Sequence, residues 1–175
     1  MNRSDEETGG WVLDLRGRID ELVNEYRSSL HDCLDGLTED EARLRLVPSK
    51  TTLLGVVKHV DDVEGVWFDQ AVTGRTSIEA GIASTPDRSF TITASDTIAS
   101  VQASYRRRCE ASRRTMADLG LDVSVSGRGD RPVWALQIQL LRELAQHTGH
   151  ADILRPSARP WRRTCADKRA YLSTG

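Results

Sequence analysis

The 175-residue sequence has little net charge, few cysteines and no long apolar run. A net charge of −2 supplies no field that would attract nucleic acid or an anionic membrane surface. No apolar stretch approaches the roughly 20 residues that cross a bilayer, and the acidic start lacks the apolar segment of a signal peptide. The three cysteines, Cys33, Cys109 and Cys165, are too widely spaced for a disulfide framework or a cysteine zinc cluster. We therefore expect a cytoplasmic protein with reduced thiols that binds neither nucleic acid nor membranes.

The motifs of several common enzyme classes are also missing. The sequence has no Gly-x-Ser-x-Gly elbow of a serine hydrolase. Gly127–Asp130 reads as a loop, because it lacks the glycine spacing of a phosphate-binding motif. Arginines cluster at 106–108 and 113–114 without an aromatic platform, which favours a solvated helix face over a nucleic-acid site.

What the sequence does contain is helical periodicity. Apolar residues recur three or four positions apart in four long segments, each bounded by a residue that starts or stops a helix. The predicted helices run from about Trp11 to Leu34, from Thr51 or Thr52 to Val72, from Ser95 or Asp96 to Leu119, and from Pro132 to Leu154. The expected stops are Gly36, Gly74, Gly120 and Pro156.

The connections between these helices suggest how they are arranged. A capping box at Thr38–Glu41 predicts a short helical turn. Residues 73–94 are too long for a tight bundle turn, so we expect them to cross the bundle or cover one end of it. Short extended pieces are predicted at Phe90–Thr93 and Val123–Val125. Four long helices with one long crossover predict an all-α fold, a four-helix bundle.

We expect one domain over residues 1–155, followed by a separate tail over residues 156–175. The tail is rich in arginine and proline, and Trp161 is its one large apolar side chain. It is predicted to pack loosely or to serve a partner surface.

Three side chains in apolar surroundings could converge on one metal ion. At about 100° per residue, Glu143, His147 and His150 fall within roughly 60° of each other, on the apolar face of the last helix. His59 has valines on its side of the second helix. Ionisable groups in an apolar seam are costly unless they are paired or bound to a metal. We therefore predict His59, Glu143 and His147 as metal ligands.

The chemistry of this donor set suits Zn²⁺, with Ni²⁺, Fe²⁺ and Mn²⁺ as alternatives. Two histidines and one glutamate would leave a fourth position open, as in catalytic zinc sites. His150 could replace Glu143 as a ligand, act as a catalytic acid or base, or support a ligand, and Asp62 could orient His59. The alternative is a buried pair, Glu143 with His147, that holds no metal.

Beyond these patterns, the sequence resembles the DinB-like superfamily over about residues 12–155. The closest branch is an actinobacterial group of unknown function, related to mycothiol-dependent maleylpyruvate isomerase and mycothiol S-transferases. The first half of the resemblance rests on Leu37–Arg43, Val47–Ser49, Leu53–Val60 and Val63–Phe68. The second half rests on Asp96–Ile98, Tyr105–Cys109 and His147–Arg155.

The resemblance implies a metal-binding four-helix bundle that forms a homodimer. Its motifs place the ligands at His59, Glu143 and His147, and leave His150 beside the metal as a catalytic residue. Relatives often have His at the position of Gln139 and two acidic residues at the position of Arg142–Glu143.

The function that follows is a metal-dependent transferase that activates a low-molecular-weight thiol, mycothiol, and transfers it to a small electrophile. A metal-dependent hydrolase of small molecules is a second hypothesis. The third is a non-enzymatic bundle with a structural metal and a partner-binding role.

Overall fold

The computed structural model of the chain describes residues 14–158. In chain order its elements are α1 (Leu15–Asp32), α2 (Glu39–Ala42), α3 (Leu53–Gly65), the π-helical turn η2 (Val66–Gln70), α4 (Ala71–Thr73), α5 (Pro86–Ser89), α6 (Ile98–Met116), β1 (Ser124–Val125), β2 (Arg131–Pro132) and α7 (Val133–Ala158). The predicted all-α class is confirmed, since the two strands are two residues long. No helix in this range is long and apolar enough to span a membrane.

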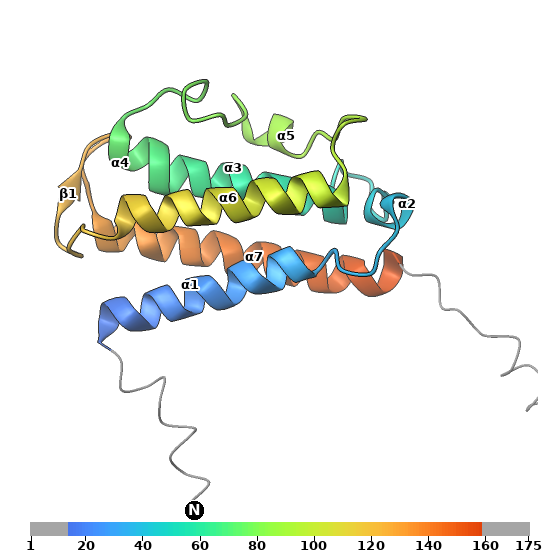
Figure 1. Ribbon diagram of the computed structural model, residues 1–175, viewed down its shortest axis with the longest axis horizontal. Helices are drawn as coiled ribbons and strands as arrows, with labels where there is room; N and C mark the ends of the chain where they lie inside the picture. The colour runs from blue at the N-terminus through green and yellow to red at the C-terminus, as the bar shows by residue number, and fades with distance from the viewer. Residues whose placement is uncertain (1–13, 159–175) are drawn as a thin grey trace, which may run out of the picture.

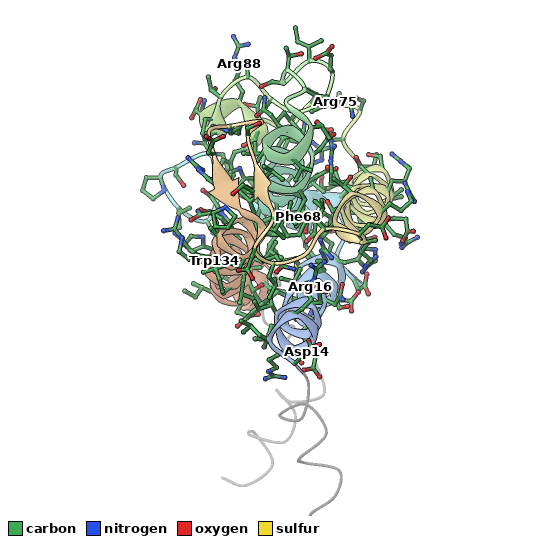
Figure 2. All side chains as sticks on the ribbon, turned by 90° about the vertical axis from the view of Figure 1, so that its left-hand side faces the viewer. Asp14, Arg16, Phe68, Arg75, Arg88 and Trp134 are labelled. Atoms are coloured by element: carbon green, nitrogen blue, oxygen red, sulfur yellow. The ribbon has the colours of Figure 1, made fainter. Side chains whose placement is uncertain are left out.

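The longest helices, α1, α3, α6 and α7, lie side by side around a shared apolar core (Figure 1). α1 packs on α7, and α3 packs on both α6 and α7. Viewed along the helices, Phe68 lies between them and Trp134 lies on the outside (Figure 2). The core contains mainly leucine and valine, and its fully buried members include Leu30, Leu54, Val57, Leu136, Leu140 and Leu144.

The helices begin where side chains can cap the free backbone N–H groups of a first turn. Thr52, one of the two predicted starts, caps α3 and accepts from the Gly55 N–H. The capping box of Thr38 and Glu41 is confirmed. The third long helix begins two to three residues later than expected, because Thr97 is the N-cap of α6.

The second predicted helix is interrupted once along its length. After α3 the backbone forms the π-helical turn η2, and α4 then continues to Thr73. Gly74 ends this helix at φ 75°, a left-handed conformation that glycine adopts without strain. A π-helical turn holds an extra residue, so it changes which side chains after Gly65 share the face of His59.

The ends of α7 differ from the expected ones. Pro132 belongs to β2, which pairs with β1, so the helix begins at Val133. The extended piece predicted at Val123–Val125 thus corresponds to β1, whereas Phe90–Thr93 does not form a strand in the described structure. At the other end α7 continues through Pro156 to Ala158. Proline has no backbone N–H, so one hydrogen bond is missing near this end of the helix. Most of the predicted tail, including Trp161, lies outside the described residues.

Candidate functional site

The second and last long helices bring the predicted site residues together. The imidazole rings of His59 on α3 and His147 on α7 are 4.6 Å apart between centroids and meet edge to face, at 73°. Glu143 lies one turn before His147, and its Oε2 is 3.8 Å from His147 Nε2. Both histidines are buried, whereas Glu143 is partly buried. These three side chains therefore lie near one another, as the sequence predicted.

Two residues of the crossover segment hold the His59 ring. His59 Nδ1 lies 2.6 Å from the Ser89 hydroxyl oxygen at the end of α5. Phe90 stacks on the same ring, with centroids 4.0 Å apart and planes 17° from parallel. Asp62, which the sequence offered as a residue that could orient His59, instead accepts a hydrogen bond from the Ala83 N–H at 3.2 Å. The Nδ1 partner of His59 comes from the crossover segment and not from the next turn of its own helix.

Burial keeps both imidazoles neutral near pH 7. Loss of solvation, with a smaller contribution from His147, lowers the pKa of His59 to about 4. Loss of solvation and the neighbouring His150 also lower the pKa of His147, and Glu143 offsets this only in part. A neutral imidazole carries a nitrogen lone pair that can bind a metal, whereas imidazolium has none.

The Glu143 carboxylate is held by its own helix. Its Oε1 accepts from Gln139 Nε2 at 2.8 Å and from Arg142 Nη2 at 3.0 Å. Within residues 14–158, no three His, Cys, Asp or Glu side chains stand together in a metal-binding arrangement. His59, Glu143 and His147 are thus neighbours, and their shared role as metal ligands stays a prediction.

His150 lies one turn beyond His147 and remains open to solvent. The two Nδ1 atoms are 3.4 Å apart, and the ring centroids are 5.4 Å apart. An imidazole in this position can exchange protons with water while touching a buried partner. Its predicted catalytic role is compatible with this placement and stays a prediction.

A cavity of about 560 Å³ adjoins these residues, and His59 and Glu143 form part of its wall. Cavities of this size hold small molecules. Apolar surface comes from Val63, Val66, Trp67 and Ile82, and polar groups come from Gln70, Ser77, Ser84 and Thr85. Arg128, in the loop between β1 and β2, lies over the Trp67 ring at 5.9 Å and donates to Gln70 Oε1 at 3.1 Å.

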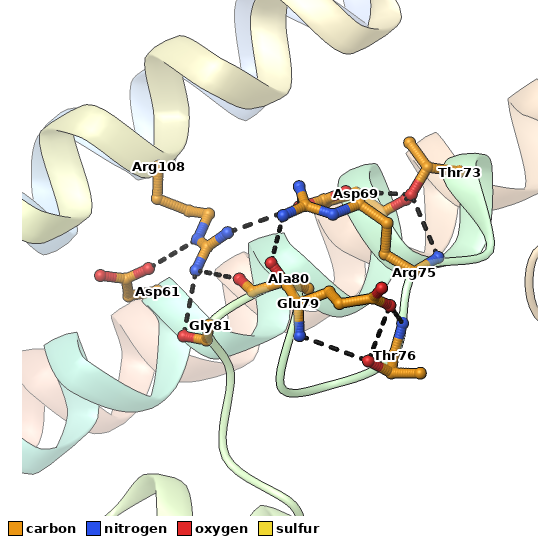
Figure 3. A network of polar contacts seen from close by, with 9 residues as sticks. All are labelled: Asp61, Asp69, Thr73, Arg75, Thr76, Glu79, Ala80, Gly81 and Arg108. Carbon is orange, nitrogen blue, oxygen red and sulfur yellow. Dashed lines mark hydrogen bonds and ion pairs between the residues drawn. The ribbon is translucent and has the colours of Figure 1, made fainter.

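The crossover segment that closes this cavity is anchored from α6 (Figure 3). Arg108 donates to Asp61 Oδ1 and to the Ala80 carbonyl, both at 2.9 Å. The segment approaches closely because residue 65 is a glycine. A Cβ on Gly65 would lie 2.5 Å from Ile82 Cγ2 and 3.2 Å from Arg108 Cζ.

A second cavity, of about 570 Å³, lies between α1 and α6 and contains none of the predicted site residues. The arginines in its wall are already paired. Arg16 donates to Asp20, and Arg27 donates to Glu64. The cavity beside His59 is therefore the better candidate, since it combines open volume with neutral imidazoles.

Sequence reasoning missed Ser89 and Phe90 as partners of His59. Phe90 belongs to the extended piece predicted at Phe90–Thr93, and Ser89 lies in a polar stretch where serine is common. A sequence signal existed only for the α5 turn, where Thr85 and Pro86 are a typical N-cap and first helical residue. That the turn would lie against His59 could not be predicted from spacing within one helix.

Comparison with known families identifies the family of the chain. The family model described as mycothiol-S-transferase matches residues 18–160, from the first turn of α1 to beyond the end of α7. No curated protein matches the chain. The matched region includes every predicted site residue and both walls of the cavity beside His59. The chain belongs to the mycothiol-S-transferase family, a DinB-like family.

Proposed function

We propose that the protein transfers mycothiol to a small electrophile in the cavity beside His59. The observation that carries this proposal is the meeting of two buried, neutral imidazoles and a carboxylate at the wall of a cavity of about 560 Å³. Family membership supplies the thiol and the reaction type. The electrophile and the metal dependence are part of the proposal.

His59, Glu143 and His147 would hold a divalent cation, with Zn²⁺ as the first choice and Ni²⁺, Fe²⁺ or Mn²⁺ as alternatives. Ligand atoms about 2.1 Å from a tetrahedral zinc ion lie about 3.4 Å from each other. The 3.8 Å between His147 Nε2 and Glu143 Oε2 needs only a small adjustment to reach that spacing. When bound, the cation would supply a positive charge that favours the thiolate form of the substrate over the thiol.

His150 is proposed to act as the catalytic acid or base beside this site. It touches His147 through the two Nδ1 atoms, and its exposure would let it take up through solvent the proton that the thiol loses. The thiolate sulfur then forms a bond to carbon. With a halide, the carbon–halogen bond breaks and the halide leaves. With an epoxide or an activated double bond, the opened oxygen or the neighbouring carbon takes up a proton, which His150 could return.

The test uses protein purified without a histidine tag and loaded with each metal in turn. Metal content is measured by inductively coupled plasma mass spectrometry, and conjugation of mycothiol to a chloronitrobenzene is followed by mass spectrometry. We expect about one metal ion per chain and thiol conjugation that depends on it. His59→Ala and His147→Ala should lose both.

His31→Ala is the matched control, because His31 lies outside the cavity and contacts Asp32 and Arg106. It should retain metal and activity. Full conjugation by metal-free His147→Ala would refute the proposed metal role. Product formed equally well without a thiol would instead favour the hydrolase. The homodimer expected from the resemblance is checked on the same preparation by light scattering.

A further inference from the structure

We infer that Ser89 is a positioning residue that sets which nitrogen of His59 carries the hydrogen, leaving Nε2 as the nitrogen that can bind a metal. This inference rests on the proposed function for its metal, but the geometry behind it is a property of the protein alone. Ser89 lies in the segment between α4 and α6, which contains none of the predicted metal ligands.

Two consecutive hydrogen bonds, from Ser89 to Pro86 and between Ser89 and His59, fix the position of the His59 hydrogen. The Ser89 hydroxyl oxygen lies 2.5 Å from the Pro86 carbonyl oxygen and 2.6 Å from His59 Nδ1. A carbonyl oxygen can only accept, so the single hydroxyl hydrogen of Ser89 must point to Pro86. The serine oxygen therefore has only lone pairs to offer His59. Consequently Nδ1 must carry the hydrogen and donate it.

Within residues 14–158, no other side chain competes for the Ser89 hydroxyl. Ser89 is 2% exposed, and α5 fixes Pro86 three residues earlier on the same short helix. The stacked Phe90 ring prevents His59 from turning about its side-chain bonds without losing that contact. In the neutral imidazole a hydrogen on Nδ1 leaves the lone pair on Nε2. No hydrogen bond within residues 14–158 involves Nε2.

The position of this hydrogen decides which His59 nitrogen can bind a metal. A ligating histidine binds through the nitrogen without a hydrogen, and the partner of the other nitrogen decides which one that is. Removing such a partner typically weakens metal binding about 10–100-fold. Ser89 would thus act on the metal through His59, without being a ligand itself.

The direct test is long-range ¹⁵N NMR of histidine-labelled, metal-free protein at pH 7. The wild-type spectrum should show His59 with its hydrogen on Nδ1. A spectrum with the hydrogen on Nε2 would overturn the inference without any variant. In Ser89→Ala the hydrogen should redistribute between the two nitrogens, and Ser89→Thr, which keeps the hydroxyl, should restore the wild-type pattern.

Ser112→Ala is the matched control, because Ser112 is also buried but its hydroxyl makes no hydrogen bond in the described part of the chain. It should leave the His59 signals and the zinc Kd unchanged, while Ser89→Ala raises the zinc Kd about 10–100-fold. If wild-type protein binds zinc and Ser89→Ala binds it equally well, the inference falls and the proposed function stands. If wild-type protein binds no metal but shows the expected His59 signals, the proposed metal role falls and the assignment of the hydrogen stands.

Discussion

Arg27 on α1 and Glu64 on α3 form a two-point ion pair inside the core, with Nε–Oε1 at 2.7 Å and Nη2–Oε2 at 2.8 Å. Glu64 is completely buried, and the Arg27 guanidinium also lies 5.9 Å from the centre of the Phe68 ring. The parallel geometry satisfies both carboxylate oxygens. Because Glu64 follows His59 by five residues on α3, this pair ties α1 to the helix that carries the candidate site.

Replacing Arg27 with Met should therefore destabilise the protein by about 3–5 kcal/mol, since the Glu64 charge would remain buried without its partner. The double variant Arg27→Met/Glu64→Leu should recover much of this loss. Urea unfolding measures both. The exposed pair of Arg114 and Glu110 provides the control, and Arg114→Met should change stability by less than about 1 kcal/mol. A double variant no more stable than the single one would contradict this account.

Gly127 should not tolerate even a methyl group. A Cβ there would lie 2.3 Å from the Gln70 carbonyl oxygen, and the Gly127 N–H donates to the Ala71 carbonyl at 3.0 Å. We expect Gly127→Ala to cost about 1–3 kcal/mol, because neither backbone can move away without losing hydrogen bonds. Gly149→Ala is the control, since no atom of the described residues outside its own helix turn lies within 4 Å of the place that a Cβ would take there. It should stabilise by up to about 1 kcal/mol. Thermal unfolding of both variants provides the comparison, and equal effects would argue against close packing at Gly127.

Asp62 should make stability depend on pH. Burial and the neighbouring Asp61 raise the pKa of Asp62 to about 6, although the Ala83 N–H and two nearby cations oppose this. The folded state therefore binds this proton more tightly than the unfolded state. The cost of charging Asp62 is absent below pH 4, grows as the pH rises, and is complete above pH 6.

Asp62→Asn should accordingly be more stable than wild type at pH 7.5, by roughly 1 kcal/mol after allowance for its partial exposure. The difference should disappear at pH 4. Urea unfolding of metal-free protein at both values checks this. An advantage that is equal at the two pH values would show that charge is not the cause.

Zinc should stabilise the protein, and the Glu143 carboxylate should contribute to this stabilisation. At a zinc concentration about 100 times the Kd, the expected gain in unfolding free energy is about 2.7 kcal/mol. Glu143→Gln keeps the size of the side chain but removes its charge, so the gain should shrink markedly. Glu110→Gln, on the exposed side of α6, should retain the full gain. Differential scanning fluorimetry with and without chelator measures it, and an identical gain in Glu143→Gln would remove Glu143 from the ligand set.

Local sequence patterns were sufficient to predict the helices and part of the candidate site. The spacing of apolar residues located the helices to within a few residues, since a helix face and an N-cap depend on neighbours three or four positions away. The same periodicity placed Glu143, His147 and His150 on one face. Errors arose at Pro132, which pairs with Ser124 in a short strand instead of opening the helix, and at Pro156, which does not end α7.

The sequence by itself determined the all-α class, the helical segments and the inward placement of His59 and His147. Only the tertiary structure decided which groups touch these imidazoles, because those groups come from segments far away in the chain. Ser89 and Phe90 reach His59 through a loop that Arg108 anchors from α6, and Arg27 reaches Glu64 from α1. Periodicity reports which way a side chain faces, whereas the partner it meets depends on how the helices and loops pack together.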